Sequence, residues 1–221
     1  MQSTPGRIGA LKALVFLAAL YPFGRLAASA VWFPELLGAN PAEYITRSLG
    51  DWCLRLLLIT LAVTPLRRIT GWNWLLRLRR MLGLFAFFYA VVHFASYIAF
   101  DHVFDVVEIL KDVVKRPFIT VGFTALLLIV PLAATSTNAM VRRLGARNWR
   151  ALHRLVYPIA ILGVLHFWWM VKRDVTEPAI YAALLAALLG HRVFHAWRDA
   201  RSGRAAASPR TSAAAAARDG G

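Results

Sequence analysis

Long apolar runs, separated by short segments rich in arginine, constrain the fold of this chain more than any other feature of its sequence. A helix that crosses a bilayer needs about 20 predominantly apolar residues. The chain has 221 residues, of which 59% are hydrophobic, yet it carries a formal net charge of +15. Its mean hydropathy is +0.55. A soluble domain would spread its charges more evenly. The pattern therefore predicts an all-α integral membrane protein.

Six runs are long enough to be transmembrane helices of one domain, residues 1–200. Their approximate ranges are 8–31, 52–66, 81–100, 118–135, 151–171 and 178–197. The first run is interrupted by Pro22 and Arg25, and a cleaved signal peptide is the alternative interpretation. We keep it as a span because it is long for a signal segment and no small-x-small cleavage site follows. The second run is short and contains Arg55, whose side chain we expect to reach the interface.

Basic residues predict the orientation of these helices. Seventeen of the 26 lysines and arginines lie in segments that should share one side: 7–12, 67–80, 142–150 and the chain from Arg192 onward. The opposite loops mix acids with bases. By the positive-inside rule, both termini and the two arginine-rich loops are cytoplasmic. The basic surplus thus has a topological reason and does not require nucleic-acid binding.

Cysteine content and missing motifs narrow the function. Cys53 is the only cysteine, so there is no internal disulfide and no thiolate cluster for zinc or iron–sulfur. Neither a Walker-type GK[ST] nor a GxGxxG after a strand occurs, so we expect no binding of ATP or NAD(P)H. The Ala-, Ser-, Arg- and Gly-rich residues 201–221 predict a disordered cytoplasmic tail.

Histidines at membrane depth are the candidate functional residues, because ionisable side chains there are costly. His93, His166 and His191 fall within predicted spans, and His153 lies at the start of one. A hydrogen bond to a neighbouring helix carbonyl explains any single one equally well, but several together favour a common role.

His93 and His166 are the best pair. Each lies on a helix that enters from the arginine-rich side, about 18 Å and about 22 Å along it respectively at 1.5 Å per residue. Two neutral imidazoles at similar depth on separate helices can supply both axial ligands of a haem iron. The pair predicts a haem near the periplasmic face.

His153 predicts a second cofactor level near the cytoplasmic face, about 20 Å from His166. Thirteen residues of ideal helix rotate by about 220°, so the two histidines would not share a face unless Pro158 kinks the helix. The third helix offers Arg80 rather than a histidine at this level. His191, in the sixth helix, is a further candidate ligand.

Arg77, Arg79 and Arg80 have two compatible interpretations. They can fix the topology of the chain. They can also bind haem propionates or a flavin phosphate at the cytoplasmic mouth, because guanidinium groups match such oxyanions.

Several motifs agree in order and spacing with one family over residues 48–172. They are Thr64-Pro-Leu with the following arginine pair, RRMLGL from Arg79, VHFASY from Val92, RPF from Arg116, ATSTNAM from Ala134, WRALHRLVY from Trp149 and LHFW from Leu165. On these residues the chain resembles the MsrQ (YedZ) family. Its members are haem-binding membrane subunits of the bacterial periplasmic methionine sulfoxide reductase system, within the wider ferric-reductase-like transmembrane group.

The resemblance implies a b-type haem protein of the bacterial inner membrane that also binds FMN. It would pass electrons from quinol or a cytosolic flavin reductase to a periplasmic molybdopterin enzyme, MsrP, which reduces methionine sulfoxide in envelope proteins. His93, His153 and His166 occupy the haem-linked positions of the family, whereas His191 is outside its pattern. The wider group has two bis-histidine sites, but this chain has Arg80 where the lower site would need a histidine. The resemblance therefore implies either one haem or two.

Two alternatives remain. The same scaffold could reduce ferric or cupric ions at the periplasmic face, although the chain carries no flavin/NAD domain to support that. A transporter or assembly factor could instead use its intramembrane histidines for protons or a metal. No acid occurs from Trp52 to Phe100 or from Val113 to Arg173, which disfavours a proton route.

Overall fold

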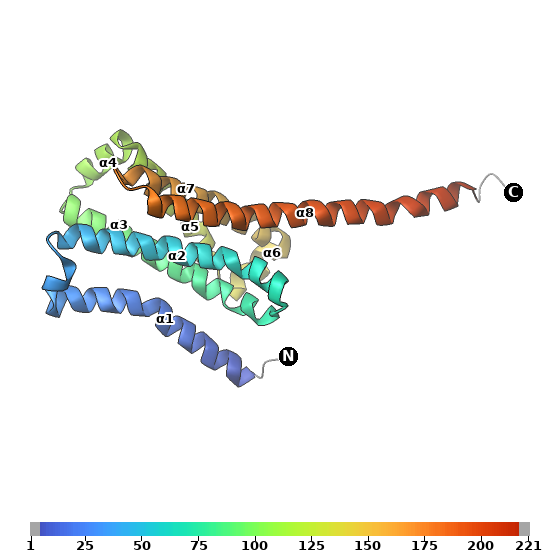
Figure 1. Cartoon of the computed structure of the whole chain (residues 1–221), viewed down its shortest axis with the longest axis horizontal. Helices are drawn as coiled ribbons and strands as arrows, with labels where there is room; N and C mark the ends of the chain where they lie inside the picture. Colours follow the sequence, from blue (N-terminus) through green and yellow to red (C-terminus); the bar gives the residue numbers. More distant parts are fainter. Residues whose placement is uncertain (1–4, 217–221) are drawn as a thin grey trace.

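The computed structural model describes the backbone of residues 5–216 and the side chains of residues 6–202. The described chain is helical throughout, and its elements form an elongated bundle (Figure 1). They are α1 Pro5–Trp32, η1 Pro34–Leu37, α2 Pro41–Thr70, η2 Asn73–Arg77, α3 Arg79–Asp101, α4 Val106–Lys115, α5 Pro117–Ala134, α6 Asn138–Leu152, η3 His153–Leu155, α7 Val156–Met170 and α8 Thr176–Ala216, where η denotes a 3₁₀ helix.

Six helices are long and apolar enough to cross a membrane, which confirms the predicted fold class and number of spans. They are Gly6–Trp32, Pro41–Thr70, Arg79–Asp101, Pro117–Ala134, Asn138–Met170 and Thr176–Ser202. The short helix α4 is not among them. The chain is therefore a multi-pass membrane protein.

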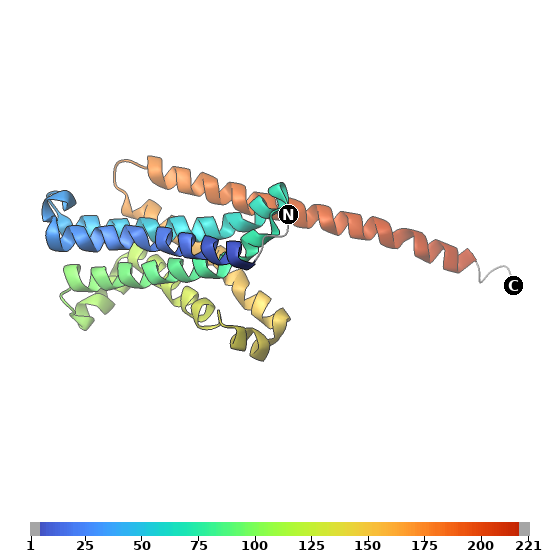
Figure 2. The ribbon, with the colours of Figure 1, turned by 90° about the horizontal axis from the view of Figure 1, so that it is seen from below.

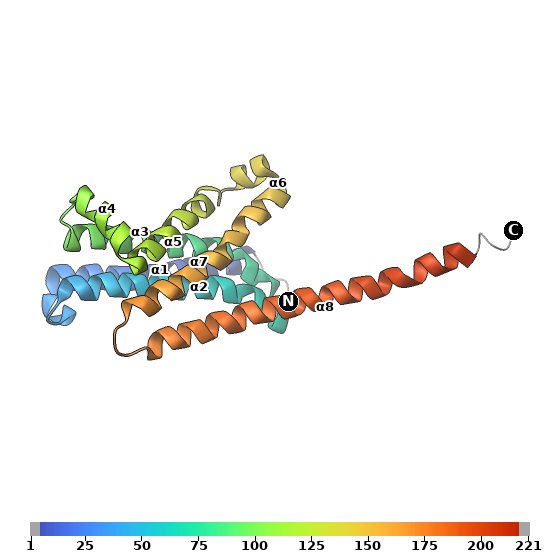
Figure 3. The same ribbon diagram turned by 90° about the horizontal axis from the view of Figure 1, so that it is seen from above.

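Successive spans run in opposite directions along the bundle (Figures 1 and 2). Helix α1 starts, and α8 leaves the bundle, at the end where the α2–α3 connection and α6 lie. Figure 3 shows α8 continuing well past this end. These are the segments that hold the basic surplus, so the arrangement agrees with a single arginine-rich end. That this end is cytoplasmic stays a prediction.

The six helices pack as two main pairs, α2 against α3 and α5 against α7, with α1 and α8 outside them. Side chains of α2, α3 and α7 form much of the buried core, among them Leu61, Ala86, Tyr89 and Ala160, each 0% exposed. The space between the two pairs is where side chains of α3 and α7 meet.

The interruption in α1 has a local cause. Pro22 lies inside the helix, and the Tyr89 hydroxyl of α3 is inserted beside it. This hydroxyl donates to the Ala19 carbonyl at 2.9 Å and accepts from the Phe23 amide at 3.0 Å. A side chain inserted into the i→i−4 ladder bends a helix without ending it, so α1 remains one span.

Helix α2 begins at Pro41 instead of Trp52, because Asn40 caps its first turn and accepts from the Glu43 amide at 3.3 Å. Arg55 is therefore in mid-helix. Its Nε donates to the hydroxyl of Tyr181 on α8 at 2.8 Å, and its reach to the interface stays a prediction. The earlier start also brings Asp51 inside the span.

A proline in α2 explains how α8 is attached. Pro65 has no N–H, so the carbonyl of Leu61 lacks its usual helical donor. Arg192 of α8 fills the gap, donating from Nη2 to this carbonyl at 2.6 Å and from Nη1 to the Tyr157 hydroxyl at 3.0 Å. Residues 201–221, predicted as a disordered tail, begin within α8, whose backbone continues to Ala216. Side chains after Ser202, and residues 217–221 altogether, lie outside the described residues.

Candidate functional site

His93 of α3 and His166 of α7 face each other between the two helix pairs. Their ring centroids are 6.2 Å apart, and the rings are inclined by 74°. Two imidazoles that ligate one metal ion, each with a metal–nitrogen distance of about 2.0 Å, have centroids about 6 Å apart. The separation thus fits two axial ligands of one iron.

Each imidazole is anchored to a helix of the pair to which its own helix belongs. His93 Nδ1 lies 2.8 Å from the Thr46 carbonyl of α2, and His166 Nδ1 lies 2.7 Å from the Phe118 carbonyl of α5. A carbonyl only accepts, so both rings carry their proton on Nδ1. The Nε2 atoms are left with free lone pairs, the arrangement that metal-ligating histidines usually have.

A glycine lies four residues after each accepting carbonyl. A Cβ at Gly50 would be 3.1 Å from His93 Cε1, and a Cβ at Gly122 would be 2.7 Å from His166 Nδ1. The two rings therefore rest on helix backbone where no side chain intervenes. Thr46 with Gly50, and Phe118 with Gly122, make two matching imidazole seats, which we call the α2 seat and the α5 seat.

A second site lies nearer the arginine-rich end. A cavity of about 510 Å³ is bordered by α2, α3, α5 and the α6–α7 junction. Four arginines line it, Arg79, Arg80, Arg150 and Arg154, together with His153, Trp149 and Tyr157. Among the described residues that line the cavity, His153 is the only imidazole. We call this space the inner cavity and the His93–His166 pair the outer site.

His153 is held firmly but leaves one ring nitrogen unused. Its Nδ1 lies 3.0 Å from the Trp149 carbonyl, and its ring stacks on Trp149 with centroids 3.8 Å apart. Its Nε2 is buried without a hydrogen-bond partner. A buried orphan acceptor is uncommon and calls for an explanation, and a ligand in the inner cavity would supply one.

A 3₁₀ turn interrupts the helix between His153 and His166. The chain between them is not one ideal α-helix, because His153–Leu155 forms η3 between α6 and α7. The break lies before Pro158 rather than at it.

The other candidate residues are dispersed. Arg77, in η2, is exposed and does not line the inner cavity, unlike Arg79 and Arg80. His191 packs against His195 with ring centroids 4.3 Å apart, away from the cavity lining. Groups of three or more potential metal-ligating side chains are absent from the described part of the chain.

The sequence interpretation missed the residues that seat the two imidazoles. Backbone carbonyls carry no sequence signal of their own. Gly50 and Gly122 do, because glycine in a helix interior is unfavourable by about 1 kcal/mol relative to alanine and usually has a packing reason when it occurs.

Comparison with known proteins agrees with this architecture. Residues 49–164 match the model of the family described as ferric reductase like transmembrane component. The chain is 59% identical to the protein-methionine-sulfoxide reductase heme-binding subunit MsrQ of Herminiimonas arsenicoxydans over 197 residues, which cover 88% of this chain and 89% of the relative. It is 55% identical to the MsrQ subunit of Ralstonia nicotianae, over 90% of this chain and 92% of that protein. It is also 56% identical to the MsrQ subunit of Rhodospirillum rubrum, over 86% of this chain and 91% of that protein.

Proposed function

We propose an electron-transfer function for this chain, which belongs to the ferric reductase-like transmembrane family and, within it, to the MsrQ heme-binding subunits of protein-methionine-sulfoxide reductase. In this proposal the chain lies in the bacterial inner membrane and conducts electrons from the cytoplasmic or membrane side to the periplasm. The acceptor is the molybdopterin reductase MsrP, which repairs oxidised methionine in envelope proteins.

The observation that carries the proposal is the facing pair His93 and His166. Their ring centroids are 6.2 Å apart, and because both Nδ1 atoms donate to backbone carbonyls, both Nε2 lone pairs are available to a ligand. The described spans offer no other pair of histidines from two different helices in such contact. We assign His93 and His166 as the axial ligands of a b-type haem, which when bound would supply a one-electron carrier there.

The inner cavity supports FMN rather than a second bis-histidine haem. Arginines at its border would hold a phosphate group, and Trp149 and Tyr157 offer aromatic surfaces to a flat ring. His153 is its single imidazole, so a second axial nitrogen is missing from the described lining. Arg79, Arg80 and His153 are therefore the proposed cofactor-binding residues at this level. Arg77 and His191, which do not line the cavity, are not assigned to it.

Two electron donors remain in the proposal. A cytosolic flavin reductase would act at the inner cavity, at the arginine-rich end. Quinol would act from the bilayer, and a recess of about 310 Å³ between α1 and α2, whose lining includes Arg25, Asp51 and Trp52, supports that route. Within the six described spans, Asp51 is the only acid more than one helical turn from an end. A Cβ added at its neighbour Gly50 would lie 3.1 Å from His93, so a proton acceptor and the outer site share α2.

The test is the reduced-minus-oxidised absorption spectrum of the detergent-purified full chain. We expect a low-spin b-type spectrum that is lost or becomes high-spin in His93→Ala and in His166→Ala. The matched control, His195→Ala, removes an imidazole outside both sites and should keep the wild-type spectrum. A colourless wild-type protein from haem-replete cells would contradict the proposal and favour a transporter or assembly factor.

A second measurement separates the donors and the acceptor. Haem reduction is followed without oxygen after adding a quinol analogue, or NADH with a flavin reductase. Purified MsrP and a methionine sulfoxide peptide are then added. Reoxidation with formation of methionine would support the assigned partner. Reoxidation by ferric citrate alone would instead support a metal reductase.

A further inference from the structure

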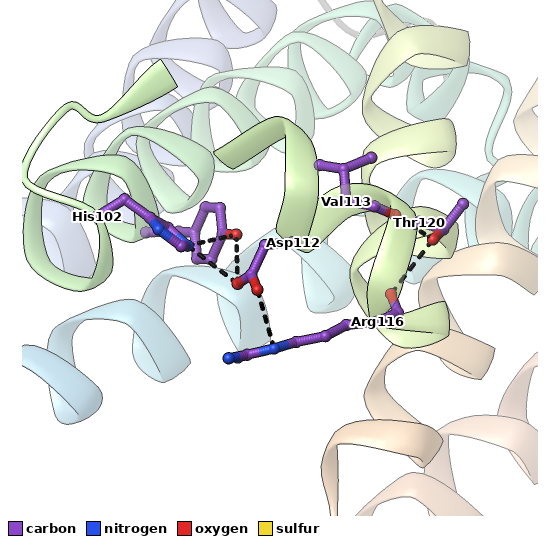
Figure 4. A network of polar contacts seen from close by, with 6 residues as sticks. His102, Asp112, Val113, Arg116 and Thr120 are labelled. Atoms are coloured by element: carbon purple, nitrogen blue, oxygen red, sulfur yellow. Dashed lines mark hydrogen bonds and ion pairs between the residues drawn. The ribbon is translucent and has the colours of Figure 1, made fainter. Parts of the chain in front are cut away.

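One half-buried carboxylate lies where the helices of the outer site meet the outer end of the bundle. Asp112 of α4 has a side chain only 14% exposed; it forms hydrogen bonds with two side chains and an ion pair with a third. Tyr97 donates from its hydroxyl at 3.1 Å, His102 Nε2 lies at 3.0 Å, and Arg116 Nε lies at 3.1 Å. Figure 4 shows His102 and Arg116 reaching this carboxylate from opposite sides.

On one side the network contacts α3, the helix that carries His93. Tyr97 lies four residues after His93, so the two side chains project from the same face of α3, one turn apart. His102, which ends α3 as its C-cap residue, also contacts the Tyr97 hydroxyl at 2.8 Å. Tyr97 and His102 thus connect the outer end of α3 to Asp112.

On the α5 side the network reaches the carbonyl that anchors the second candidate. Arg116 is the N-cap residue of α5, and Pro117 opens the helix. Phe118 follows directly, and its carbonyl accepts from His166 Nδ1 at 2.7 Å. The Thr120 hydroxyl ties the same turn to α4 through the carbonyls of Val113 and Arg116 (Figure 4). An ion pair and the two hydrogen bonds of Thr120 therefore connect the start of α5 to α4 and Asp112.

The packing of the bundle explains why a link between α3 and α5 matters for the outer site. Helix α3 packs mainly on α2, and α5 mainly on α7, so the two imidazoles belong to different pairs. A planar cofactor between them would keep the pairs apart at that level. Direct packing of α3 on α5, such as Phe94 against Phe123 with ring centroids 5.5 Å apart, already links the pairs. Hydrogen bonds to a carboxylate at the outer end add a further link, of a kind that is among the stronger ones a protein can provide.

We propose that Asp112 is a positioning residue for the outer haem. It braces the His93-bearing helix against the α5 seat of His166 and so holds the two ligands at the spacing that one iron requires. The inference rests on the proposed haem between His93 and His166. It assigns a role to α4, a helix too short to span the membrane.

The variants Asp112→Asn and Tyr97→Phe test the brace in the purified full chain. Asp112→Asn removes the negative charge with little change in shape, and Tyr97→Phe removes one hydroxyl from α3. The matched control is Glu108→Gln on the same helix, because the Glu108 side chain is 53% exposed and pairs only with Lys111 at 2.6 Å. Haem content, the low-spin electron paramagnetic resonance spectrum and the midpoint potential are measured for each.

We expect Asp112→Asn to retain several-fold less haem than the control and to shift both the resonance spectrum and the midpoint potential. Tyr97→Phe should keep its haem and show a smaller shift in the same direction, which remains informative if Asp112→Asn does not fold. Wild-type values in both variants would overturn the brace while leaving the proposed function intact. Absence of haem from the wild-type chain would instead overturn the proposed function.

Discussion

The outer site and the inner cavity differ in the side chains that form them and in the space they enclose. The outer site has two imidazoles, each seated on a backbone carbonyl beside a glycine, at a spacing that suits one metal ion. The inner cavity has one imidazole among four arginines and two aromatic side chains, around a space of about 510 Å³. The first arrangement fixes geometry, and the second provides positive charge and room.

This difference indicates what each site demands of its ligand. A haem held by two imidazoles needs both nitrogens within a few tenths of an ångström of their positions, so the outer site should tolerate very little added volume. An anionic, flat ligand held by several guanidinium groups loses only part of its binding energy when one group is removed. The predictions below test this contrast.

Gly122→Ala should have the largest effect. The added Cβ would lie 2.7 Å from His166 Nδ1, so the ring must leave the Phe118 carbonyl and its Nε2 must move. Overpacking of this kind costs about 1–3 kcal/mol, which corresponds to roughly tenfold weaker retention of haem. Haem content is measured by pyridine haemochrome and compared with Gly190→Ala, where a Cβ meets nothing within 4 Å. Equal haem in the two variants would show that the α5 seat is not restrictive.

Arg79→Gln should weaken the inner site alone. Arg79 lines the inner cavity. Because glutamine can still donate a neutral hydrogen bond to a phosphate, the loss is about 1 kcal/mol, or about fivefold in Kd. FMN is titrated into the flavin-depleted chain and its fluorescence followed. Arg77→Gln, an exposed change in the neighbouring turn, is the control and should bind FMN as the wild type does. A weakened Arg77→Gln variant would mean that general surface charge governs the affinity.

His153→Ala should lower the FMN content a few-fold and leave the outer low-spin spectrum unchanged. The variant removes the ring stacked on Trp149 and the orphan Nε2 at the cavity, which offer the flavin a hydrogen bond worth about 1 kcal/mol. Acid-released flavin and the haem-to-protein ratio are measured together, with His191→Ala as the control. A haem ratio that falls by half would identify a second haem at this level in place of FMN.

The spans and the facing of His93 and His166 could be predicted from the sequence because both depend on periodic features. Apolar runs and arginine-rich gaps give six helices, and counting residues along two helices that run the same way gives a common depth for His93 and His166. Helix ends were harder to predict. Asn40 and Pro41 start α2 well before its apolar run, so Arg55, near the start of the predicted span, lies in mid-helix.

What the sequence could not give are contacts made by the backbone. The Thr46 and Phe118 carbonyls seat the two imidazoles whatever side chains those residues carry, and the Leu61 carbonyl receives Arg192 only because Pro65 leaves it free. The 3₁₀ turn at His153 likewise depends on how α6 meets α7 rather than on a helix-breaking residue at that position.

Gly50→Ala gives the smallest expected effect and the sharpest comparison, because it repeats the Gly122 change at the α2 seat. Its Cβ would lie 3.1 Å from His93 Cε1 and 3.2 Å from His93 Nδ1, contacts that a displacement of a few tenths of an ångström relieves without breaking the bond to Thr46. We therefore expect haem content within about twofold of the wild type and a detectable change in the low-spin resonance spectrum, since the ring must tilt. If Gly50→Ala lost as much haem as Gly122→Ala, the closeness of the added Cβ to the ring would not determine how much haem is lost. The two imidazoles would then be equally intolerant of displacement.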